Sequence, residues 1–330
     1  MKKLVLTGPG KSQVIDAPMP EFNDDEMLIK IVYYGVCMSE RYAWENFESG
    51  NGIDKDFGHE PVGIVEEVGK NITKFKKGDR VTGFFSGGIA QYNVANESNT
   101  WPVPDNVSFE DATGEPLACL LSAVSKVPMT FPGEDSVAVV GCGYMGCGAI
   151  SLLKMRGAGK IVAVDTRRES LENALKYGAD EAYLPEELPE EYLADRAHPS
   201  DRGFDYVMEW GETDESLNLA IVLTKMLGFL GIGAYHTGPS RTIDMQLANV
   251  KAIDMLSTHP RDTERTERGC AKALDLLSSG QWKFSNVPVK IFSMTMLDEA
   301  MKQNDEKFGT YLKALLDCQN LDCEPKLLNV

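Results

Sequence analysis

The stretch from residue 135 to residue 165 constrains the fold of this chain more than any other. It reads DSVAVVGCGYMGCGAISLLKMRGAGKIVAVD, in which two wholly apolar runs flank a glycine-rich segment and an apolar helical run. Runs that are apolar throughout, rather than alternating with polar residues, are typical of parallel strands buried on both faces of a sheet. The stretch therefore predicts strand, turn, helix and strand at the start of a doubly wound parallel sheet.

The turn has G-x-G-x-x-G spacing, which is weak evidence alone and stronger between a strand and a helix. Gly141 permits a tight turn, Gly143 lets the backbone approach a pyrophosphate, and Gly146 lets the helix pack closely. The helix N-terminus directs N–H groups toward that negative charge. The cofactor-binding residues expected here are Gly141, Gly143, Tyr144, Met145, Gly146 and, after a later strand, Gly211. The alternative is an ordinary glycine turn in an α/β protein.

Asp165 ends the second apolar strand and lies about 20 residues beyond the third glycine, as the dinucleotide fingerprint requires. Its carboxylate can accept hydrogen bonds from the ribose hydroxyls of the adenosine half, and it would repel a 2′-phosphate. NAD(H) is therefore favoured over NADP(H). Arg167 and Arg168 leave NADP(H) open, because a nearby arginine can accommodate that phosphate.

The rest of the chain predicts two domains. Roughly the first 110 residues carry short strand-like runs and turn signals, which indicate a compact barrel-like β-domain. We expect a helix near residues 110–127, and later sheet strands at 181–185, 204–211 and 228–238, with a helix over 214–227. The end should hold a helix, a strand, a second helix and a final helical segment over 310–318. We expect residues 1–117 with 258–330 to form one domain and 118–257 the other.

Composition excludes several classes of partner. The 330 residues carry a net charge of −17, which argues against nucleic acid and anionic membranes. No apolar run approaches the roughly 18 residues of a membrane span. A Gly-Pro-Gly turn at residues 8–10 interrupts the basic N-terminal start, so we expect no signal peptide and a cytoplasmic protein. The seven cysteines form no CxxC pair, which suits a reducing compartment.

A possible metal site lies in the β-rich region. Cys37, His59 and Glu60 fall within it, and Glu115 stands at its junction with the nucleotide-binding region. Cysteine, histidine and carboxylate are the ligand types of catalytic zinc. Each residue taken singly fits a purely structural role equally well. The set as a whole, next to a dinucleotide site, favours a catalytic zinc.

An ordered series of motifs now points to a family. GVCMSE, GHEPVGIVEEVG, KKGDRV, GGIAQYNV, PVPDNVSFEDAT, GEPLAC and GCGYMG follow one another along nearly the whole chain. In this order they resemble the zinc-dependent medium-chain dehydrogenase/reductase family, which includes alcohol, sorbitol and threonine dehydrogenases. The resemblance implies an α/β fold: a GroES-like β-rich catalytic domain plus a Rossmann doubly wound parallel-sheet domain. It also implies a homo-oligomer, a dimer or tetramer.

The resemblance assigns roles to the candidate metal residues. Cys37 and His59 match the family's zinc ligands, and Glu60 matches a glutamate that is a ligand in some states of the site. Glu115 stands where many alcohol dehydrogenases have cysteine and the polyol branch has glutamate, so the ligand pattern is nearer to the sorbitol dehydrogenases. The family's structural zinc lobe has four cysteines, and no cysteine occurs in that region before Cys119. We expect one zinc per chain.

The same resemblance suggests how catalysis proceeds. Glu40 should orient His59, and Ser39 should take the proton of a substrate hydroxyl. Tyr42 stands where the family often has a relay histidine, so the route of that proton stays open. We expect a site in the cleft between the domains, where a hydride passes between a secondary alcohol and NAD.

The substrate is expected to be a small molecule: a polyol, sugar or cyclitol. Trp44, Tyr235 and His236 are candidate substrate residues, and Tyr235 and His236 could equally form a loop packed over the cofactor. Two alternatives remain for the protein as a whole. One is a zinc-free, NADPH-dependent quinone or enoyl reductase of the same superfamily. The other is a non-catalytic NAD(H)-binding protein.

Overall fold

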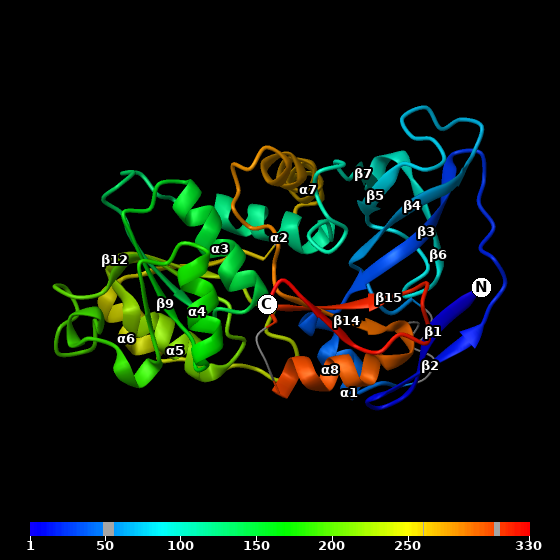
Figure 1. Cartoon of the computed structure of the whole chain (residues 1–330). Helices are drawn as coiled ribbons and strands as arrows, with labels where there is room; N and C mark the ends of the chain where they lie inside the picture. The colour runs from blue at the N-terminus through cyan, green and yellow to red at the C-terminus, as the bar shows by residue number, and fades with distance from the viewer. Residues whose placement is uncertain (49–55, 260, 307–310) are drawn as a thin grey trace. The chain divides into compact units, whose positions relative to one another are not determined.

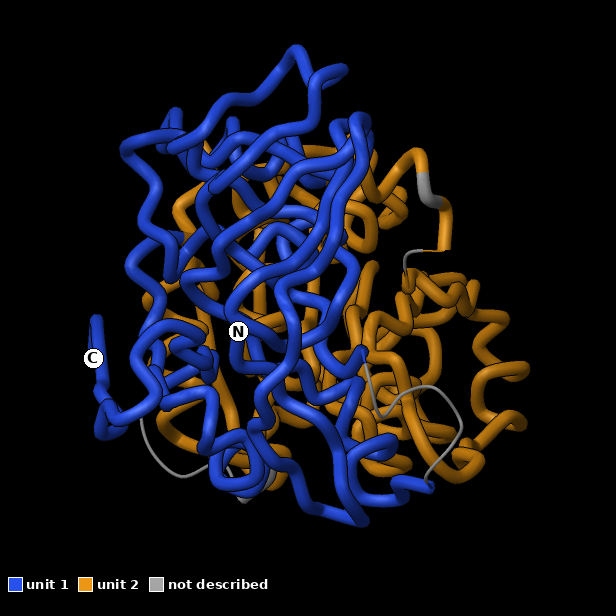
Figure 2. The backbone as a smooth tube through the Cα atoms, turned by 90° about the vertical axis from the view of Figure 1, so that its right-hand side faces the viewer, with its two compact units in different colours: residues 1–118, 270–280, 285–330 blue, residues 119–269, 281–284 orange. Residues whose placement is uncertain are grey.

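The computed structural model describes residues 1–48, 56–259, 261–306 and 311–330. The chain divides into two compact units, which Figure 2 shows in blue and orange. Unit 1 contains residues 1–118, 270–280 and 285–330, and unit 2 contains residues 119–269 and 281–284. The sequence predicts a return to the first domain at residue 258, whereas unit 1 resumes at Cys270. His259 and Arg261 belong to unit 2, where they pack on Tyr235.

Unit 2 is built on a six-stranded sheet in which every neighbouring pair is parallel. Its strands are β8 (Ser136–Val140), β9 (Lys160–Val164), β10 (Glu181–Tyr183), β11 (Phe204–Glu209), β12 (Thr224–Ile232) and β13 (Asp254–Ser257). The order across the sheet is β10-β9-β8-β11-β12-β13. In chain order this is 3-2-1-4-5-6, the doubly wound dinucleotide-binding arrangement. The fold predicted for this region is confirmed.

Four helices cover this sheet on both faces, as the green and yellow ribbons of Figure 1 show. They are α3 (Tyr144–Met155), α4 (Arg168–Lys176), α5 (Asp214–Leu223) and α6 (Met245–Lys251). Helices α3 and α4 pack on β8, β9 and β10, and α5 and α6 on the other half of the sheet. The buried Lys251 ammonium donates hydrogen bonds to the carbonyls of Ile221, Val222 and Thr224, which satisfies the C-terminus of α5.

The helix predicted over 214–227 was too long. Helix α5 ends at Leu223, and residues 224–227 belong to β12. Thr224 pairs with Phe204 of β11, and the register then shifts around Leu227, whose φ is +58°. Strand pairing in the sheet therefore overrides the local helical pattern of these residues.

Unit 1 is β-rich, as predicted. A hairpin of β1 (Lys2–Gly8) and β2 (Lys11–Asp16) stands beside an eight-stranded sheet. The sheet follows the path β16 (Lys326–Leu328), β14 (Val289–Ser293), β15 (Lys313–Asp317), β3 (Glu26–Gly35), β4 (Pro61–Val68), β5 (Arg80–Gly83) and β7 (Thr100–Pro102), and β6 (Tyr92–Asn96) pairs with β3. The helices α1 (Arg41–Glu45) and α8 (Leu297–Glu306) belong to this unit, whereas α2 (Gly114–Ser125) and α7 (Thr263–Ser278) cross the unit boundary.

The final helical segment predicted over 310–318 was wrong. Residues 313–317 form strand β15, which is parallel to β14 and antiparallel to β3. Ala314, Leu315 and Leu316 are all fully buried, so the strand is covered on both faces. Residue 310 lies outside the described part of the chain.

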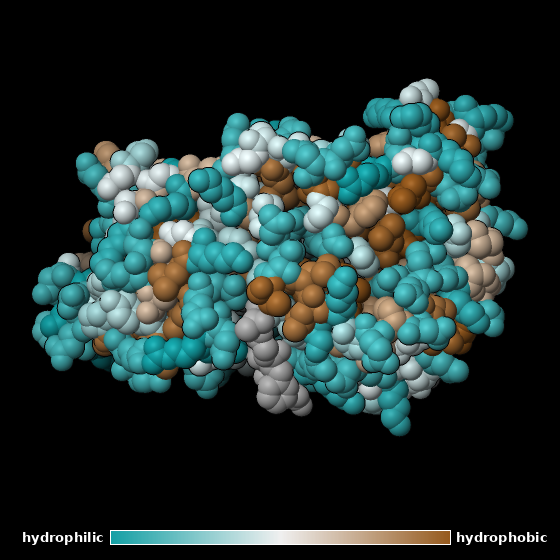
Figure 3. Space-filling view, viewed as in Figure 1, coloured by the Kyte–Doolittle hydropathy of each residue, from teal (hydrophilic) through white to brown (hydrophobic). Residues whose placement is uncertain are grey.

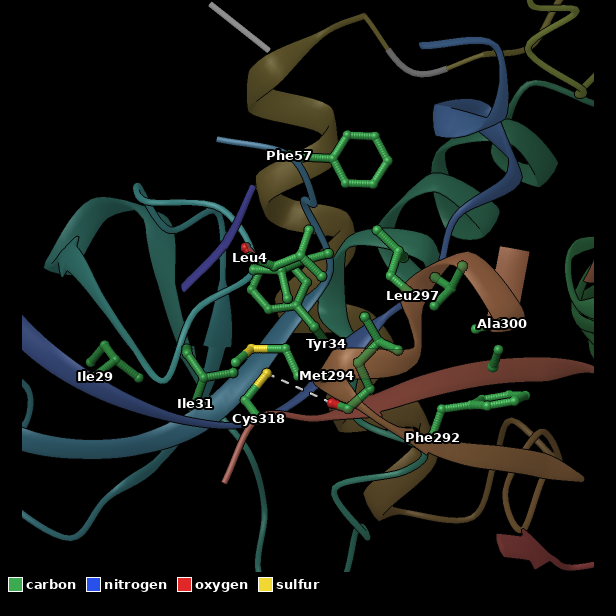
Figure 4. Close-up of a cluster of buried hydrophobic side chains, with 14 of the residues drawn as sticks. Leu4, Ile29, Ile31, Tyr34, Phe57, Phe292, Met294, Leu297, Ala300 and Cys318 are labelled. Atoms are coloured by element: carbon green, nitrogen blue, oxygen red, sulfur yellow. Dashed lines mark hydrogen bonds between the residues drawn. The ribbon is translucent and has the colours of Figure 1, made fainter. Parts of the chain in front are cut away.

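The core of unit 1 gathers side chains that are far apart in sequence. Figure 4 shows Leu4 and Tyr34 packed near Met294 and Leu297, and Phe292 next to Ala300. Full burial of side chains such as Leu or Met is worth roughly 1.5–3 kcal/mol each. This core holds β3 and β15 together, so the residues at the end of β3 lie close to those of β15.

The surface view in Figure 3 is mostly hydrophilic, with separate apolar patches. None of the helices in the described residues is both long enough and apolar enough to cross a membrane.

Candidate metal centre and nucleotide-binding turn

Cys37 is positioned by the end of strand β3. The strand stops at Gly35, whose N–H donates to the carbonyl of Glu60, and the chain then enters a short 3-10 helix, Met38–Glu40. A Cβ on Gly35 would lie 1.9 Å from Glu60 Oε2. Glycine is therefore required at position 35 so that the Glu60 carboxylate can sit beside Cys37.

His59 is oriented by Glu40. Glu40 Oε1 lies 2.8 Å from His59 Nδ1 and also accepts the Gly58 N–H at 2.9 Å. A carboxylate at Nδ1 favours a hydrogen on that nitrogen, so Nε2 is the nitrogen that can bind a metal once its own proton is displaced. Gly58 has a φ of +102°, a conformation that side-chain-bearing residues rarely adopt. The structure thus gives Glu40 the contact that the sequence predicted.

Three potential ligands converge in unit 1. One ligand atom each from Cys37, His59 and Glu60 lies within 4.8 Å of the others. Glu115, in the first turn of α2, brings its Oε2 to 4.0 Å from His59 Nε2. Thiolate, imidazole and carboxylate at this spacing fit a tetrahedral zinc, which takes these donor types. Among the described residues this is the one cluster of its kind.

The protonation of the cluster follows from its burial. Burial and the neighbouring Glu60 raise the pKa of the Cys37 thiol, although His59 acts in the opposite direction. Burial also works to lower the pKa of His59, but its hydrogen bonds with Cys37 and Glu40 outweigh this and raise that pKa to about 12. A metal must therefore displace protons from these groups on binding.

Lys313 belongs to the same cluster, and sequence reasoning missed it. The register pairs Leu315 with Gly35, and the Val36 N–H donates to the Ala314 carbonyl, so Lys313 lies beside Cys37. Lys313 Nζ is 2.5 Å from Glu60 Oε2, and both residues are buried. Burial lowers the pKa of Lys313, but Glu60 and Cys37 raise it more, so the lysine stays charged.

The sequence does mark Lys313 as unusual, but it does not show which residue is its partner. A single lysine interrupts the apolar segment YLKALL, and a charged group in such a segment needs a buried partner. Reading the segment as a helix gave no reason to connect it with Glu60.

The predicted catalytic residues Ser39 and Tyr42 and the candidate substrate residue Trp44 lie in three different environments. Ser39 Oγ is 3.1 Å from Cys37 Sγ, so the hydroxyl lies at the cluster. Tyr42 is 49% exposed. Trp44 is buried, and its indole N–H donates to Asp298 Oδ1 at 2.9 Å, which places this candidate substrate residue in the core of unit 1.

The glycine turn of unit 2 has the geometry that the sequence predicts. Gly141 has a φ of +90°, and a Cβ there would lie 2.7 Å from the backbone nitrogen of Gly211. A Cβ on Gly146 would lie 1.9 Å from the Gly141 carbonyl oxygen, whereas one on Gly143 would meet nothing within 4 Å. No side chain caps the N-terminus of α3. The turn therefore offers an open backbone and helix N–H donors to a pyrophosphate.

Asp165 is held by four donors. It accepts hydrogen bonds from the backbone N–H groups of Cys142 and Arg167, and from the Arg167 guanidinium through Nε and one terminal nitrogen. A carboxylate has about four acceptor sites, so ribose hydroxyls must displace the Arg167 side chain. Arg168 pairs instead with Glu187.

The remaining candidates of unit 2 differ in accessibility. Tyr144 is buried, and its ring packs 5.1 Å from that of Phe284, whereas Met145 is partly exposed. Tyr235 is 49% exposed, and its ring centroid lies 4.7 Å from that of His259. His236 Nε2 lies 2.8 Å from Glu209 Oε2, and its Nδ1 faces Arg241. Both nitrogens of His236 therefore have protein partners.

Comparison with known proteins identifies the family. Residues 23–105 match the model of the alcohol dehydrogenase GroES-like domain, and residues 145–278 match that of the zinc-binding dehydrogenases. The chain belongs to the zinc-dependent medium-chain dehydrogenase/reductase family. The family and the fold predicted from the sequence are confirmed.

Relatives within the family match along almost the entire chain. D-xylulose reductase A of Aspergillus oryzae is 28% identical over 350 residues, which cover 94% of this chain and 95% of the relative. Human sorbitol dehydrogenase is 26% identical over 360 residues, covering 98% of this chain and 97% of the relative. Acetophenone reductase from Geotrichum candidum, solved in complex with NAD, has the same fold with a TM-score of 0.81, at 20% identity and with 98% of both chains covered.

Proposed function

We propose that this dehydrogenase uses one zinc ion per chain and transfers a hydride between a secondary alcohol of a polyol, sugar or cyclitol and NAD. The observation that carries this proposal is the convergence of Cys37, His59 and Glu60, next to Glu115, in unit 1. The names of the relatives, D-xylulose reductase and sorbitol dehydrogenase, support a polyol substrate.

The ligand set defines the role of the metal. A zinc ion held by Cys37, His59 and Glu115, with Glu60 as an alternative ligand, would act as a Lewis acid toward a substrate oxygen. Glu40 fixes the His59 ring so that Nε2 faces the other ligands. Lys313 compensates the charge of Glu60 inside the protein.

Ser39 is the proposed first acceptor of the substrate hydroxyl proton. Its Oγ lies 3.1 Å from Sγ of Cys37, one of the proposed metal ligands, so it is near a substrate oxygen bound at that site. Tyr42, with half of its surface exposed, is the proposed next group on the route to solvent.

The cofactor preference is proposed to be NAD(H) over NADP(H). Asp165 supplies a negative charge where a 2′-phosphate would lie, although Arg167 partly neutralises it. Asp165→Asn should therefore lower the NAD/NADP ratio of kcat/KM, because NADP is no longer repelled by the carboxylate. An unchanged NAD/NADP ratio of kcat/KM in this variant would contradict the assignment.

The function is tested by a screen of polyols, cyclitols and simple alcohols with NAD, following absorbance of the reduced cofactor. We expect polyol oxidation that is lost on chelation and restored by zinc, with zinc measured in the purified protein by elemental analysis. A metal-free protein that reduces quinones or enoyl compounds with NADPH would favour the zinc-free alternative. NAD(H) binding without turnover of any alcohol would favour the non-catalytic one. The homo-oligomer and the cytoplasmic location stay predictions.

A further inference from the structure

Three side chains form a stack at the carboxyl edge of the unit 2 sheet. Tyr235 follows β12, and His259 and Arg261 follow β13. The rings of Tyr235 and His259 lie 4.7 Å apart with an angle of 38° between their planes. The Arg261 guanidinium carbon lies 5.1 Å from the Tyr235 ring centroid. This Tyr235–His259–Arg261 stack is exposed at both Tyr235 and Arg261.

The position of the stack relates it to the reacting end of a dinucleotide. Ligands of doubly wound sheets bind at the carboxyl ends of the strands, with the pyrophosphate at the first glycine turn. That turn follows β8, and Asp165 of the adenosine half follows β9 on one side of it. Strand β13 lies three strand intervals to the other side, roughly 14 Å at about 4.8 Å per interval. The stack therefore lies on the nicotinamide side, where substrate must meet cofactor.

Two arginines at this edge, Arg241 and Arg261, make no ion pair with a carboxylate in the part of the chain that the structure describes. Most arginines of unit 2 that ion-pair do so at the surface, such as Arg168 with Glu187 and Arg196 with Asp244. Arg261 packs on an aromatic ring instead, and Arg241 donates to His236 Nδ1 and to the carbonyls of Pro239 and Thr237. Within the described residues no ion pair neutralises either guanidinium.

The Arg241 side chain is held in place by a chain of contacts that ends at a buried carboxylate. His236, which accepts from Arg241, is bound on its other side to Glu209. Glu209 is fully buried and also accepts from the Gly211 N–H and Ser216 Oγ. A guanidinium has five N–H donors, and three of those of Arg241 are used in this way. Among the described residues the other two donors have no hydrogen-bond acceptor, so they remain for a ligand.

We propose that Arg261 and Arg241 bind an anionic group of the substrate, so that the preferred substrate is a polyol carrying a phosphate or a carboxylate. This inference rests on the proposed polyol dehydrogenase function and narrows its substrate class. A chain with a net charge of −17 repels anionic substrates unless cations are gathered at the binding edge. Planar guanidinium groups suit both anions, since they form paired hydrogen bonds with phosphate and carboxylate oxygens.

The test compares sorbitol, sorbitol 6-phosphate and gluconate with NAD and zinc-loaded enzyme. We expect kcat/KM to be higher for one or both anionic compounds, and the better anion identifies the group. Arg261→Ala should lower the anionic-to-neutral ratio of kcat/KM by about 10- to 100-fold, mainly through KM, because hydrogen bonds to charged groups are of this strength. Arg241→Lys, which keeps the charge, should lose less than Arg241→Ala.

Arg202→Ala is the matched control. Arg202 also makes no ion pair with the residues that the structure describes. It donates to the carbonyl of Glu190 and lies two residues before β11, at the opposite edge of the sheet. It should leave the anionic-to-neutral ratio unchanged. Equal effects of the Arg202 and Arg261 variants would overturn the inference.

Other outcomes separate the inference from the function on which it rests. Neutral polyols oxidised as efficiently as their anionic analogues would overturn the inference and leave the proposed function intact. A loss of NADH affinity in Arg261→Ala, measured by fluorescence titration, would also overturn it, since the arginine would then serve the dinucleotide. If no polyol is oxidised, the proposed function fails. Calorimetric titration with sorbitol 6-phosphate then decides whether these arginines bind an anion. Binding weakened by Arg261→Ala supports the anion site, and binding that is absent or unweakened overturns it.

Discussion

The glycine turn of unit 2 is made by one continuous stretch of chain, whereas the metal cluster of unit 1 gathers four separate ones. The turn and its acidic residue lie between Gly141 and Arg167. The cluster takes Cys37 to Glu40 from the end of β3, Gly58 to Glu60 from the start of β4, Glu115 from α2 and Lys313 from β15.

This difference determines which atoms carry the chemistry. The turn works through backbone groups, so its requirement is the absence of side chains at Gly141 and Gly146. The cluster works through side-chain donors and buried charges, so each member depends on the others for its protonation and charge. The effects of substitutions in the cluster should therefore depend on one another. In the turn, each substitution should have an effect set by the space at its own position.

The largest effect is expected at a ligand of the cluster. Cys37→Ala removes the thiolate, and we expect zinc affinity to fall by more than about 100-fold. Even the loss of a residue that only hydrogen-bonds a metal ligand lowers metal affinity by about 10- to 100-fold. Zinc content and chelator competition measure this, with polyol oxidation as a second readout. Cys323→Ala is the control, because that cysteine is partly exposed and outside the cluster. Full zinc retention in Cys37→Ala would exclude Cys37 as a ligand.

The next largest effect tests whether the cluster behaves as a unit. Lys313→Met leaves Glu60 buried without its cation and should destabilise the metal-free protein by about 3–5 kcal/mol. Lys313→Met combined with Glu60→Leu should recover much of this loss, because no lone charge remains buried. Denaturant unfolding of chelator-treated protein measures both.

An exposed ion pair provides the comparison for Lys313. Lys77 lies 2.6 Å from Glu66 with its side chain 69% exposed. Lys77→Met should leave the free energy of unfolding almost unchanged, because exposed ion pairs contribute little to stability. Additive losses in the Lys313 and Glu60 variants would show that the two residues do not act together.

The turn should respond position by position. Gly146→Ala forces a Cβ against the Gly141 carbonyl and should destabilise the protein by about 1–3 kcal/mol. Gly143→Ala has free space, so it should unfold like the wild type yet bind NADH more weakly, since the methyl group would stand where the pyrophosphate approaches. Thermal unfolding and NADH titration separate the two effects. Unaltered NADH affinity in Gly143→Ala would remove this glycine from the nucleotide site.

The smallest effect concerns the sheet edge opposite the turn. Burial raises the pKa of Asp205, but hydrogen bonds from Lys225 and Ser136 outweigh it and hold that pKa below its ordinary value. The unfolded chain then binds more protons at low pH. The contribution of Asp205 is therefore complete above its unfolded pKa of about 3.9 and is lost as pH falls through the lower folded value.

Asp205→Asn should accordingly make the free energy of unfolding less dependent on pH in the acid range. We expect the unfolding free energy of the variant to be about 1 kcal/mol lower at pH 7, with the difference shrinking below pH 4. Denaturant unfolding across this range measures it. A difference that stays constant with pH would show that the Asp205 carboxylate is not held in its charged form.

Local pattern predicted most of unit 2 correctly. The strand–turn–helix–strand unit around Gly141 and Asp165 is encoded by neighbouring residues, so its reading needs no knowledge of distant contacts. The prediction failed where pairing decides structure. Residues 224–227 continue the helical pattern in the sequence and still belong to β12, because this segment pairs with β11 through Thr224 and Phe204.

The sequence by itself determined the nucleotide turn, the β-rich character of unit 1 and the identity of the candidate ligands. Only the tertiary structure decided that KALLD is a strand, because β14 and β3 supply hydrogen-bond partners on both sides and the core covers its apolar residues. That strand brings Lys313 to Glu60. A buried ion pair between residues this far apart has no local periodicity, so it becomes visible only when the sheet is assembled.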